Sequence, residues 1–250
     1  MMSVFCFIFG RTMVDTGLSH MEPEVLALAR AHGVSRIFLT HHHEDHSGNA
    51  DQICRKTGAK AFGHDLARAK LKTRYPVLPY QKIVWGRTTP MDLSAMPDAV
   101  ETRLGPLVPV PTPGHSKDHL CYHLPDHGVL FSGDLYLGDR IKFFRSDEDL
   151  LEEVASLKKV LALEFSTLLC GHNPRQNKGR KHILAKLDFL ENLCGQIADC
   201  HYQGDGERQI FNRLGLREDH FIKWFCFFNV SMMNGVRSVV RRLKAGDQAS

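Results

Sequence analysis

The residues with the clearest chemical potential lie in one short run, Thr40–Gly48, which reads Thr-His-His-His-Glu-Asp-His-Ser-Gly. Inside it, His41, His43, Asp45 and His46 form the pattern His-x-His-x-Asp-His. Imidazole and carboxylate side chains together suit zinc, and they also suit iron or manganese. Alternate residues of an extended chain point the same way, so His41, His43 and Asp45 can share one side while His46 turns in behind them. The alternative is a solvated loop that happens to be rich in histidine.

Three further residues of ligand type each follow a run that predicts a strand or its end. His115 ends the run Val-Pro-Val-Pro-Thr-Pro-Gly-His, Asp134 ends Val-Leu-Phe-Ser-Gly-Asp, and His172 ends Thr-Leu-Leu-Cys-Gly-His. Ligands are expected on loops at the ends of sheet strands, because a rigid sheet positions such loops. The first motif alone supplies too few ligands for a pair of metal ions, and these three residues would complete the set.

Together with Val14–Gly17, which reads Val-Asp-Thr-Gly, these motifs occur in the order found in the metallo-β-lactamase superfamily, which the sequence resembles over about residues 4–175. The resemblance implies an α/β fold, a four-layer αβ/βα sandwich, for a catalytic domain at residues 1–175. A helical C-terminal extension is expected at residues 176–250. The motifs are specific for the fold and much less specific for the substrate, because one fold hosts many functions.

The resemblance also implies a role for each ligand-type residue. The implied ligands are His41, His43 and His115 for a first metal ion, Asp45, His46 and His172 for a second, and Asp134 for both. Two zinc ions are expected, with iron or manganese as alternatives. Asp45 is in addition the candidate catalytic residue. Asp15 is implied to brace the metal-binding loop, although a turn-forming aspartate explains its position equally well.

Several neighbouring residues are left out of the ligand set. His42 and Glu44 occupy the x positions of the motif and are expected to point away from the metals. His119, four residues after His115, is predicted to be a surface histidine rather than a support for the site. Cys121 and Cys170 are predicted to be small buried strand residues.

The chemistry implied by the resemblance is hydrolysis, in which a metal-bridging hydroxide attacks an ester, thioester or lactone carbonyl of a small molecule. The Pro-Thr-Pro-Gly-His115 run is most similar to the glyoxalase II-like hydrolases of the superfamily. Two alternatives remain open: a metal-dependent nuclease of the RNase Z-like branch, and a dioxygenase with a single iron. A binding protein without catalysis is the weakest interpretation, because all seven ligand positions are filled.

Composition limits these possibilities further. The 250 residues are 43% hydrophobic and 24% charged, which is ordinary for a globular chain with one large domain or a domain and an appendage. The run Val4–Phe9 is too short to span a membrane, so no membrane association is expected. The seven cysteines are scattered and odd in number, which predicts reduced thiols and a cytoplasmic protein.

The net charge of +4 is unevenly placed along the chain. From Asn173 onward there are 13 Lys and Arg against 8 Asp and Glu, whereas the preceding residues carry 19 against 20. A solvated helical surface explains this excess most simply. The alternative is that the basic C-terminal part attracts an acidic substrate or a nucleic acid.

The local pattern predicts most of the elements that must hold these residues. Strands are expected at 4–9, 11–14, 35–40, 59–62, 104–110, 120–124, 129–132 and 167–170, and helices at 22–32, 49–57, 146–163 and from 178 onward. Ser146 and Asp149 are predicted to form a capping box at the third helix. Relatives usually carry a strand before the first hairpin, so an unpaired sheet edge is expected here, which would favour association, for example as a dimer.

Three segments are harder to interpret. Residues 64–100 are expected to be irregular, and Tyr75 and Trp85 in them fit equally a packed surface loop or a wall over the metals. Tyr136 and Arg140 leave directly from Asp134, and simple packing is slightly preferred over substrate contact. The aromatic cluster around Trp224 is predicted to be core.

Overall fold

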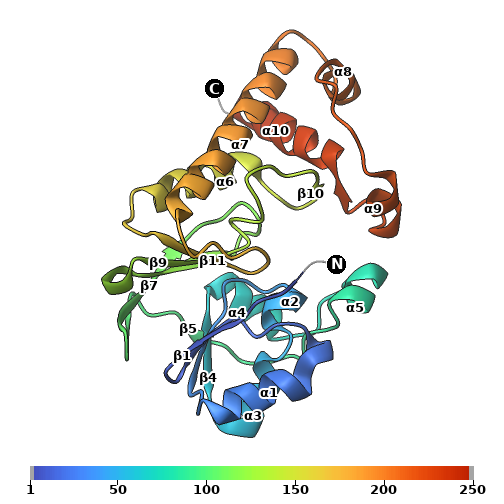
Figure 1. Ribbon diagram of the computed structural model, residues 1–250. Coiled ribbons are helices and arrows are strands. Elements are labelled where there is room, and N and C mark those ends of the chain that lie inside the picture. Colours follow the sequence, from blue (N-terminus) through green and yellow to red (C-terminus); the bar gives the residue numbers. More distant parts are fainter. Residues whose placement is uncertain (1–2, 248–250) are drawn as a thin grey trace.

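A computed structural model describes residues 3–247 of the chain, apart from the side chain of the last of these (Figure 1). The ends of the two predicted domains, residues 1–2 and 248–250, lie outside the described part. None of the helices in the described part is long and apolar enough to cross a membrane.

The N-terminal half is built on a five-stranded sheet with the order β1-β2-β3-β4-β5. Its strands are β1 (Phe7–Phe9), β2 (Thr12–Val14), β3 (Arg36–Phe38), β4 (Lys60–Gly63) and β5 (Ser94–Ala95). β1 and β2 pair antiparallel, which confirms the predicted hairpin, and the remaining neighbours are parallel. β1 is one of the two edge strands of this sheet, and no strand of the described residues pairs with its outer side.

The helices of this half are η1 (Ser19–Met21), α1 (Glu22–Ala31), α2 (Glu44–Ser47), α3 (Ala50–Thr57), α4 (Asp65–Leu71) and α5 (Pro79–Val84). α1, α3 and α4 share a hydrophobic core with this sheet, whereas α5 packs against the C-terminal part of the chain. The predicted ends of α1 and α3 are confirmed, because Gly33 and Gly58 adopt the positive φ that ends a helix readily at glycine. The segment 64–100, expected to be irregular, is only partly irregular. α4 forms because the ring of His64 accepts a hydrogen bond from the Leu66 amide at the start of the helix, and because one face of the helix is buried.

The second sheet has the order β11-β9-β8-β7-β6. Its strands are β6 (Val100–Thr102), β7 (Gly105–Pro111), β8 (Leu120–Leu124), β9 (Val129–Gly133) and β11 (Thr167–Cys170). The predicted hairpin of β8 and β9 is confirmed, with the turn η2 (Pro125–His127) and Gly128 at a positive φ. β11 then adds parallel to β9, so that the carboxyl ends of β9 and β11 lie at the same edge.

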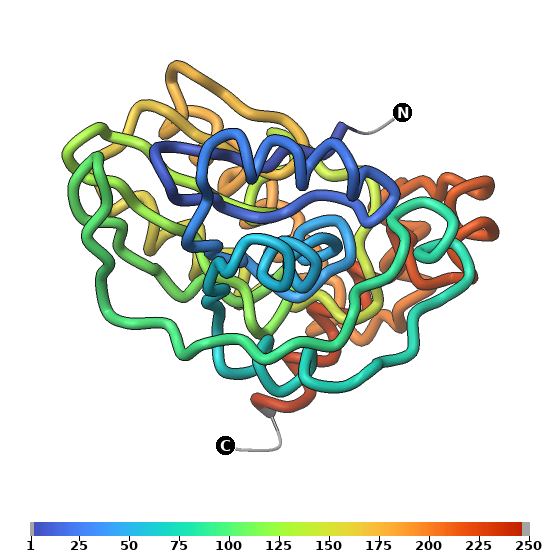
Figure 2. The backbone as a smooth tube through the Cα atoms, turned by 90° about the horizontal axis from the view of Figure 1, so that it is seen from below, coloured from blue at the N-terminus to red at the C-terminus, as the bar shows by residue number. Residues whose placement is uncertain are grey.

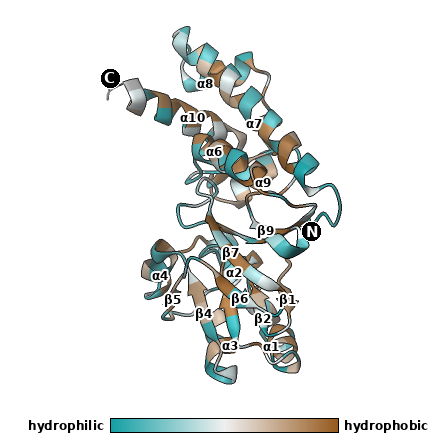
Figure 3. Ribbon diagram, turned by 90° about the vertical axis from the view of Figure 1, so that its left-hand side faces the viewer, coloured by the Kyte–Doolittle hydropathy of each residue, from teal (hydrophilic) through white to brown (hydrophobic). Residues whose placement is uncertain are grey.

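The two sheets face each other across an apolar layer that joins residues distant in sequence. Phe131 of the second sheet contacts Phe7 and Phe9 of the first, with ring centroids 5.5 Å apart in each pair. Tyr122 is buried in the same layer and its hydroxyl donates to the carbonyl of Leu39 at 2.7 Å. Figure 3 shows the hydrophobic residues concentrated along β7 and β9. With α1 and α3 outside one sheet and α6 and α7 outside the other, the expected four-layer sandwich is confirmed (Figure 1).

The C-terminal part is helical, as expected, with one short two-stranded sheet. Two elements precede it, β10 (Phe144–Arg145) and α6 (Leu150–Leu161). Its own elements are α7 (Gly179–Tyr202), α8 (Glu207–Arg213), α9 (His220–Phe225), β12 (Val230–Ser231) and α10 (Met232–Asp247). α6, α7 and α10 share one hydrophobic core with β9 and β11. The division into domains at residue 175 stays a prediction. The helices before and after this residue, α6 on one side and α7 and α10 on the other, pack in one hydrophobic core.

Two expectations for this part are wrong. α6 begins at Leu150 rather than Ser146, because the Asp149 side chain accepts from the Glu152 amide and caps the helix, while the Ser146 hydroxyl bonds to Asn229. The aromatic cluster on and after α9 is exposed rather than core. Its exposed members are Phe221, Trp224, Phe225, Phe227 and Phe228. α9 is short and packs against α5 mainly through Ile222 and through Cys226 at its end, so most of its aromatic surface faces outward.

Candidate metal centre

All seven ligand-type residues lie at the facing ends of the two sheets. β3 ends at Phe38, two residues before the histidine-rich loop, and α2 begins inside that loop, which places Asp45 and His46 in its first turn. His115, Asp134 and His172 follow β7, β9 and β11 of the other sheet. The structure therefore brings the seven side chains to one place, in two groups. That they bind metal stays a prediction.

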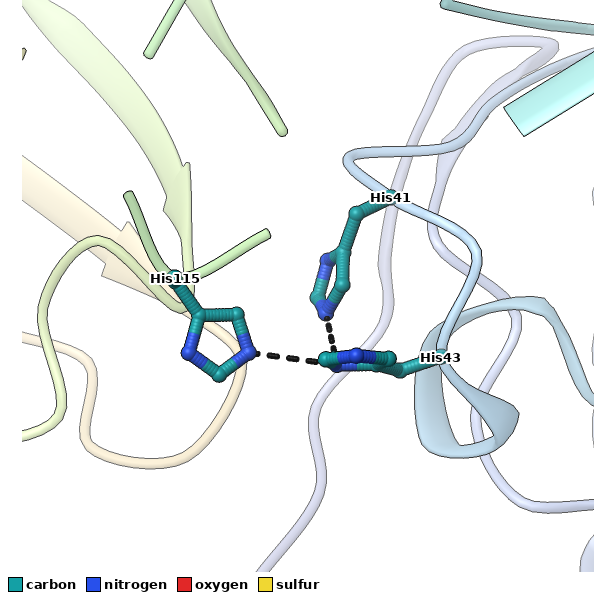
Figure 4. A group of neighbouring side chains, drawn as sticks. All are labelled: His41, His43 and His115. Carbon is teal, nitrogen blue, oxygen red and sulfur yellow. Dashed lines mark hydrogen bonds between the residues drawn. The ribbon is translucent and has the colours of Figure 1, made fainter. Parts of the chain in front are cut away.

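The first group consists of His41, His43 and His115 (Figure 4). The Nε2 atom of His41 lies 2.8 Å from Nδ1 of His43, and the Nε2 atom of His115 lies 3.1 Å from the same Nδ1. Burial is the largest cause that lowers the pKa values of His41 and His43 well below the ordinary value. Both rings are therefore neutral at pH 7, and a neutral ring offers a lone pair to a cation.

The second group consists of Asp45, His46, Asp134 and His172. The Nε2 atom of His172 lies 3.2 Å from Oδ2 of Asp45 and 3.4 Å from Oδ1 of Asp134. The Nε2 atom of His46 lies 3.2 Å from the same Asp134 oxygen.

Two buried atoms of this second group, Nε2 of His46 and Oδ1 of Asp134, lie 3.2 Å apart but are not aligned for a hydrogen bond with each other or with another atom of the described residues. Unsatisfied buried polar atoms are uncommon and each calls for an explanation. A cation between imidazole nitrogens and carboxylate oxygens would satisfy both atoms, so the residues present fit a metal ion.

Asp134 lies between the two groups. Its Oδ1 atom faces His46 and His172, as given above, and its Oδ2 atom lies 3.4 Å from Nε2 of His115 in the first group. One carboxylate thus presents one oxygen to each group. This is the arrangement that a bridging ligand needs.

The partners of the other ring nitrogens fix the protonation of three histidines. The Nδ1 atoms of His46 and His115 lie 2.8 Å from carboxylate oxygens of Asp15 and Glu148, and Nδ1 of His172 lies 2.8 Å from the Ser3 carbonyl oxygen. Each Nδ1 must donate to its acceptor, because none of these acceptors carries a proton to give. Once the ring is neutral, each Nε2 therefore points its lone pair at the group, as metal-binding histidines usually do.

Asp15 supports the interpretation as a brace for the loop. It is buried, has a φ of 55°, and accepts from both the amide and the hydroxyl of Thr40 as well as from His46. A non-glycine residue at positive φ costs free energy, and such strain is kept where the surroundings fix it.

Replacing Asp15 with Asn is expected to weaken metal binding roughly 10- to 100-fold, the usual effect of removing a carboxylate that orients a ligand. The amide keeps the shape but cannot hold the proton of His46 on Nδ1 as strongly. Zinc affinity, measured by competition with a chromophoric chelator, checks this. The control is Asp126→Asn, in the β8–β9 turn. Equal affinity in the Asp15 variant and in wild type would show that Asp15 only forms a turn.

Neighbouring carboxylates raise the pKa values of the two histidines of the second group, His46 and His172. Burial alone would lower the pKa of His172, but Asp134 and Asp45 outweigh it and raise this pKa to about 10. Burial likewise opposes a rise at His46, where Asp134 and Asp15 dominate and hold the pKa well above the ordinary value. The metal-free protein therefore carries protons on both rings at pH 7.

Metal uptake is consequently expected to release protons and to strengthen as pH rises from about 6 to about 9, since a cation must displace the Nε2 protons of His46 and His172. The slope of the logarithm of affinity against pH should exceed one. Calorimetry in two buffers of different ionisation enthalpy measures the protons released. An affinity that does not change over this range would contradict the assignment of these two histidines as ligands.

The structure corrects one residue and adds two that the sequence analysis missed. His119, predicted to lie on the surface, is buried: its Nδ1 contacts the Thr112 hydroxyl at 2.8 Å, and its Nε2 accepts from the Asp134 amide at 3.1 Å. Glu148 and Asp118 were not singled out. Glu148 orients His115, and Asp118 holds the ring and amide of His42. No spacing signal marks either residue, because each reaches the site only through tertiary packing.

The remaining residues near the motif lie outside both groups. His42 faces Asp118, and Glu44 accepts from Gln81 at 3.1 Å, so both point away as expected. Cys121 and Cys170 are buried strand residues, also as expected. Tyr136 is buried and bonds to Asp139, which favours packing.

Part of the segment 64–100 forms a wall beside the site. The ring of Trp85 lies 6.0 Å from that of His172, centroid to centroid. Tyr75 donates to the His42 carbonyl at 3.0 Å, and its ring lies 5.6 Å from the His42 ring. Of the two interpretations left open for this segment, the geometry favours the pocket wall.

Comparison with known proteins places this geometry in a family. A family model described as the Metallo-beta-lactamase superfamily matches residues 4–172. A hydroxyacylglutathione hydrolase of Cereibacter sphaeroides is 29% identical over 150 residues, 59% of this chain and 51% of that protein. An atrochrysone carboxyl ACP thioesterase of Aspergillus fumigatus is 30% identical over 192 residues, 75% of this chain and 55% of that protein. The chain thus spans about half the length of the curated relatives it matches.

Among solved structures, a metallo-beta-lactamase family protein from Thermus thermophilus superposes with a TM-score of 0.65 at 23% identity. The match covers 94% of this chain and 85% of that chain, so it includes the C-terminal helices. At this identity the likeness shows the fold alone.

Proposed function

The chain belongs to the metallo-beta-lactamase superfamily, and from this premise we propose that it is a metal-dependent hydrolase of small ester, thioester or lactone substrates. We propose two zinc ions as its cofactors, with iron or manganese as alternatives. The names of two similar proteins, a hydroxyacylglutathione hydrolase and an atrochrysone carboxyl ACP thioesterase, favour the thioester within this range. One observation carries the proposal: Asp134 presents one carboxylate oxygen to each of two buried ligand groups.

The chain's own residues would hold the pair of ions as follows. The ligands are His41, His43 and His115 for one ion, Asp45, His46 and His172 for the other, and Asp134 for both. Two ions held in this way would supply a hydroxide nucleophile near neutral pH and would neutralise charge that develops on the carbonyl oxygen.

The protein's part in the reaction is positioning and electrostatics. Asp15 and Glu148 keep His46 and His115 in one tautomer, so neither ring has to reorient during turnover. Asp45 stays ionised at neutral pH: burial raises its pKa, but His46 and His172 outweigh this and lower it. An ionised Asp45 can accept a hydrogen bond from the attacking water. The Trp85 ring lies beside His172, with centroids 6.0 Å apart, where it would limit entry of bulk water.

The metal content decides between this proposal and the single-iron dioxygenase. In the second group four buried ligand-type residues converge, which disfavours an arrangement that leaves this group empty. Elemental analysis of the purified protein should give about two metal ions per chain. About one iron per chain, with no gain of activity on adding zinc, would sink the hydrolase proposal.

The substrate panel decides the rest. Metal-loaded protein should hydrolyse thioesters or lactones, lose this activity on treatment with a chelator, and regain it when zinc is restored. Short single-stranded RNA is included because the C-terminal part carries a positive excess. Cleavage of RNA with no turnover of any carbonyl substrate would favour the nuclease instead.

A further inference from the structure

The wall beside the metal centre carries an unbalanced positive charge. Residues 66–91 contain six Lys and Arg and no Asp or Glu. Over the whole N-terminal part this local excess is hidden, because the acidic residues elsewhere cancel it. Arg68 pairs with Asp65 just outside the segment, and Lys70 lies over the Tyr75 ring and contacts His42. The other four cations form no ion pair and lie over no aromatic ring among the described residues; they are Lys72, Arg74, Lys82 and Arg87.

Three of these four cations surround one cavity, here called the basic cavity, of about 310 Å³. It is lined by Arg74, Tyr75, Pro76, Val77, Lys82, Arg87, Thr88 and Thr89. In the described part of the chain, the side chains of Arg74, Lys82 and Arg87 form no ion pair with a carboxylate. Unpaired cations that converge on one concave surface raise the local concentration of anions.

The basic cavity is fixed to the metal-binding loop at two points and to η1 at a third. Tyr75 donates to the His42 carbonyl, and His42 lies between two proposed ligands. Gln81 of α5 donates to Glu44, which lies two residues after His42 in the same loop. The Arg87 amide donates to the Ser19 hydroxyl at 3.0 Å. Figure 2 shows α5 also beside α9, where Tyr80 accepts a hydrogen bond from Asn229. These contacts hold the cavity at a set distance from the centre.

We infer that the basic cavity binds an anionic group, carboxylate or phosphate, on the carrier part of the substrate, while the acyl carbonyl lies at the metal centre. This inference rests on the proposed function and narrows its substrate class to thioesters of acidic carriers. The cavity size falls at the lower end of small-molecule sites, and Tyr75, Pro76 and Val77 give it an apolar side. Threonine hydroxyls add donors that suit either anion.

A long polyanion is less well matched by the same features. The three cations close around one small cavity, whereas a nucleic-acid strand is expected to need charges spread along a groove. A small carrier with one or two anionic groups fits the cavity better. RNA remains as an outcome of the test.

The test uses the full-length, metal-loaded protein and thioesters that share one acyl group. The carriers are N-acetylcysteamine, which is neutral, glutathione, which bears carboxylates, and coenzyme A, which bears phosphates. The variant combines Arg74→Gln, Lys82→Gln and Arg87→Gln, which removes the charge but keeps a polar, unbranched side chain. The control is Arg208→Gln, an exposed cation on α8.

Each exposed cation is expected to contribute up to roughly 5-fold, so the triple variant should lose on the order of 10- to 100-fold in kcat/KM for the preferred acidic carrier. The loss should be mainly in KM and should shrink at high salt. The neutral thioester should lose at most roughly 2-fold, and the control should match wild type for all three. Whether glutathione or coenzyme A shows the larger loss identifies carboxylate or phosphate as the anion.

A second measurement separates this inference from the proposed function. The S-ethyl thioethers of glutathione and coenzyme A cannot be hydrolysed, and their binding is followed by calorimetry. Binding to wild type but not to the triple variant supports the basic cavity even if no thioester is turned over. Equal losses for neutral and acidic thioesters, or none for either, would overturn the inference and leave the hydrolase proposal standing. Loss of RNA cleavage alone, without thioether binding, would also overturn it.

Discussion

Replacing Asp134 with Asn is expected to lower kcat/KM for the hydrolysed substrate roughly 1,000-fold or more, since a lost bridging charge is worth several kcal/mol and each 1.4 kcal/mol is about tenfold. Asp134 is the residue whose two oxygens face different groups, 3.4 Å from His115 on one side and 3.2 Å from His46 on the other. An amide offers one oxygen and no charge, so it cannot serve both. The metal content should fall from about two ions per chain toward one or fewer.

The control for this variant is Asp139→Asn, a nearby carboxylate that accepts from Tyr136 and His182 but faces neither group. It should keep both the metal content and the rate. Far-UV circular dichroism and elemental analysis on the same samples separate a folding defect from loss of metal. If Asp134→Asn retained two ions and near wild-type turnover, the proposed two-ion geometry would be wrong.

The order of strands and candidate ligands could be predicted because most of the candidate ligands directly follow a short stretch whose sequence pattern predicts a strand. The run before Asp134 is apolar and ends at Gly133, and the structure shows why: a side chain at this position, where φ is +46°, would place its Cβ atom 2.6 Å from His119. Gly171 before His172 is equally confined, with His46 2.5 Å from such an atom. Close packing around the ligands therefore leaves a mark in the sequence, as glycine, that pattern analysis can use.

The supporting residues could not be predicted for a physical reason. Glu148 is 33 positions from His115, and the contact forms only when the loop before α6 packs over the end of β7. His119 was placed on the surface because an isolated histidine carries no periodic signal, whereas the fold buries it against Thr112. The basic segment at residues 66–91 does not stand out in the net charge of the N-terminal part, because acidic residues elsewhere in that part cancel its charge.

The prediction for the exposed aromatic cluster failed for a related reason. Phe and Trp at helical spacing predict a buried face, but α9 is about one and a half turns long and packs mainly through Ile222 and through Cys226 at its end. Phe227 and Phe228 follow with φ values of 52° and 61°, a backbone that sequence periodicity does not foresee. Hydrophobicity alone does not say whether a face has a partner.

The second large effect concerns stability, at a buried ion pair that joins the C-terminal helices to the metal centre. Lys186 of α7 is buried, and its Nζ atom donates to Glu153 of α6 at 2.6 Å and to the Leu135 carbonyl, next to Asp134, at 2.7 Å. Glu153 also packs against Gly114, the residue before His115. One ammonium group therefore ties α6 and α7 to two of the loops that carry ligands.

Replacing Lys186 with Met is expected to lower the free energy of unfolding by about 3–5 kcal/mol, because it leaves the Glu153 carboxylate buried without a counter-ion. Burial already raises the pKa of Glu153, and Lys186 opposes that rise. Without Lys186 this pKa rises further, so a protonated Glu153 relieves the penalty. The loss should therefore be larger at about pH 8 than at about pH 5. Urea unfolding of the metal-free protein at both values measures it.

Two further variants make this prediction specific. Adding Glu153→Leu to Lys186→Met removes the orphaned charge and should recover much of the loss, since a buried pair is often replaceable by apolar residues. Lys158→Met breaks the exposed pair with Glu191 between the same two helices and should cost less than about 1 kcal/mol. Equal costs for Lys186→Met and Lys158→Met would mean that the C-terminal helices are held by apolar packing alone. A large cost only for Lys186→Met would make residues 176–250 a structural support of the metal site rather than an independent appendage.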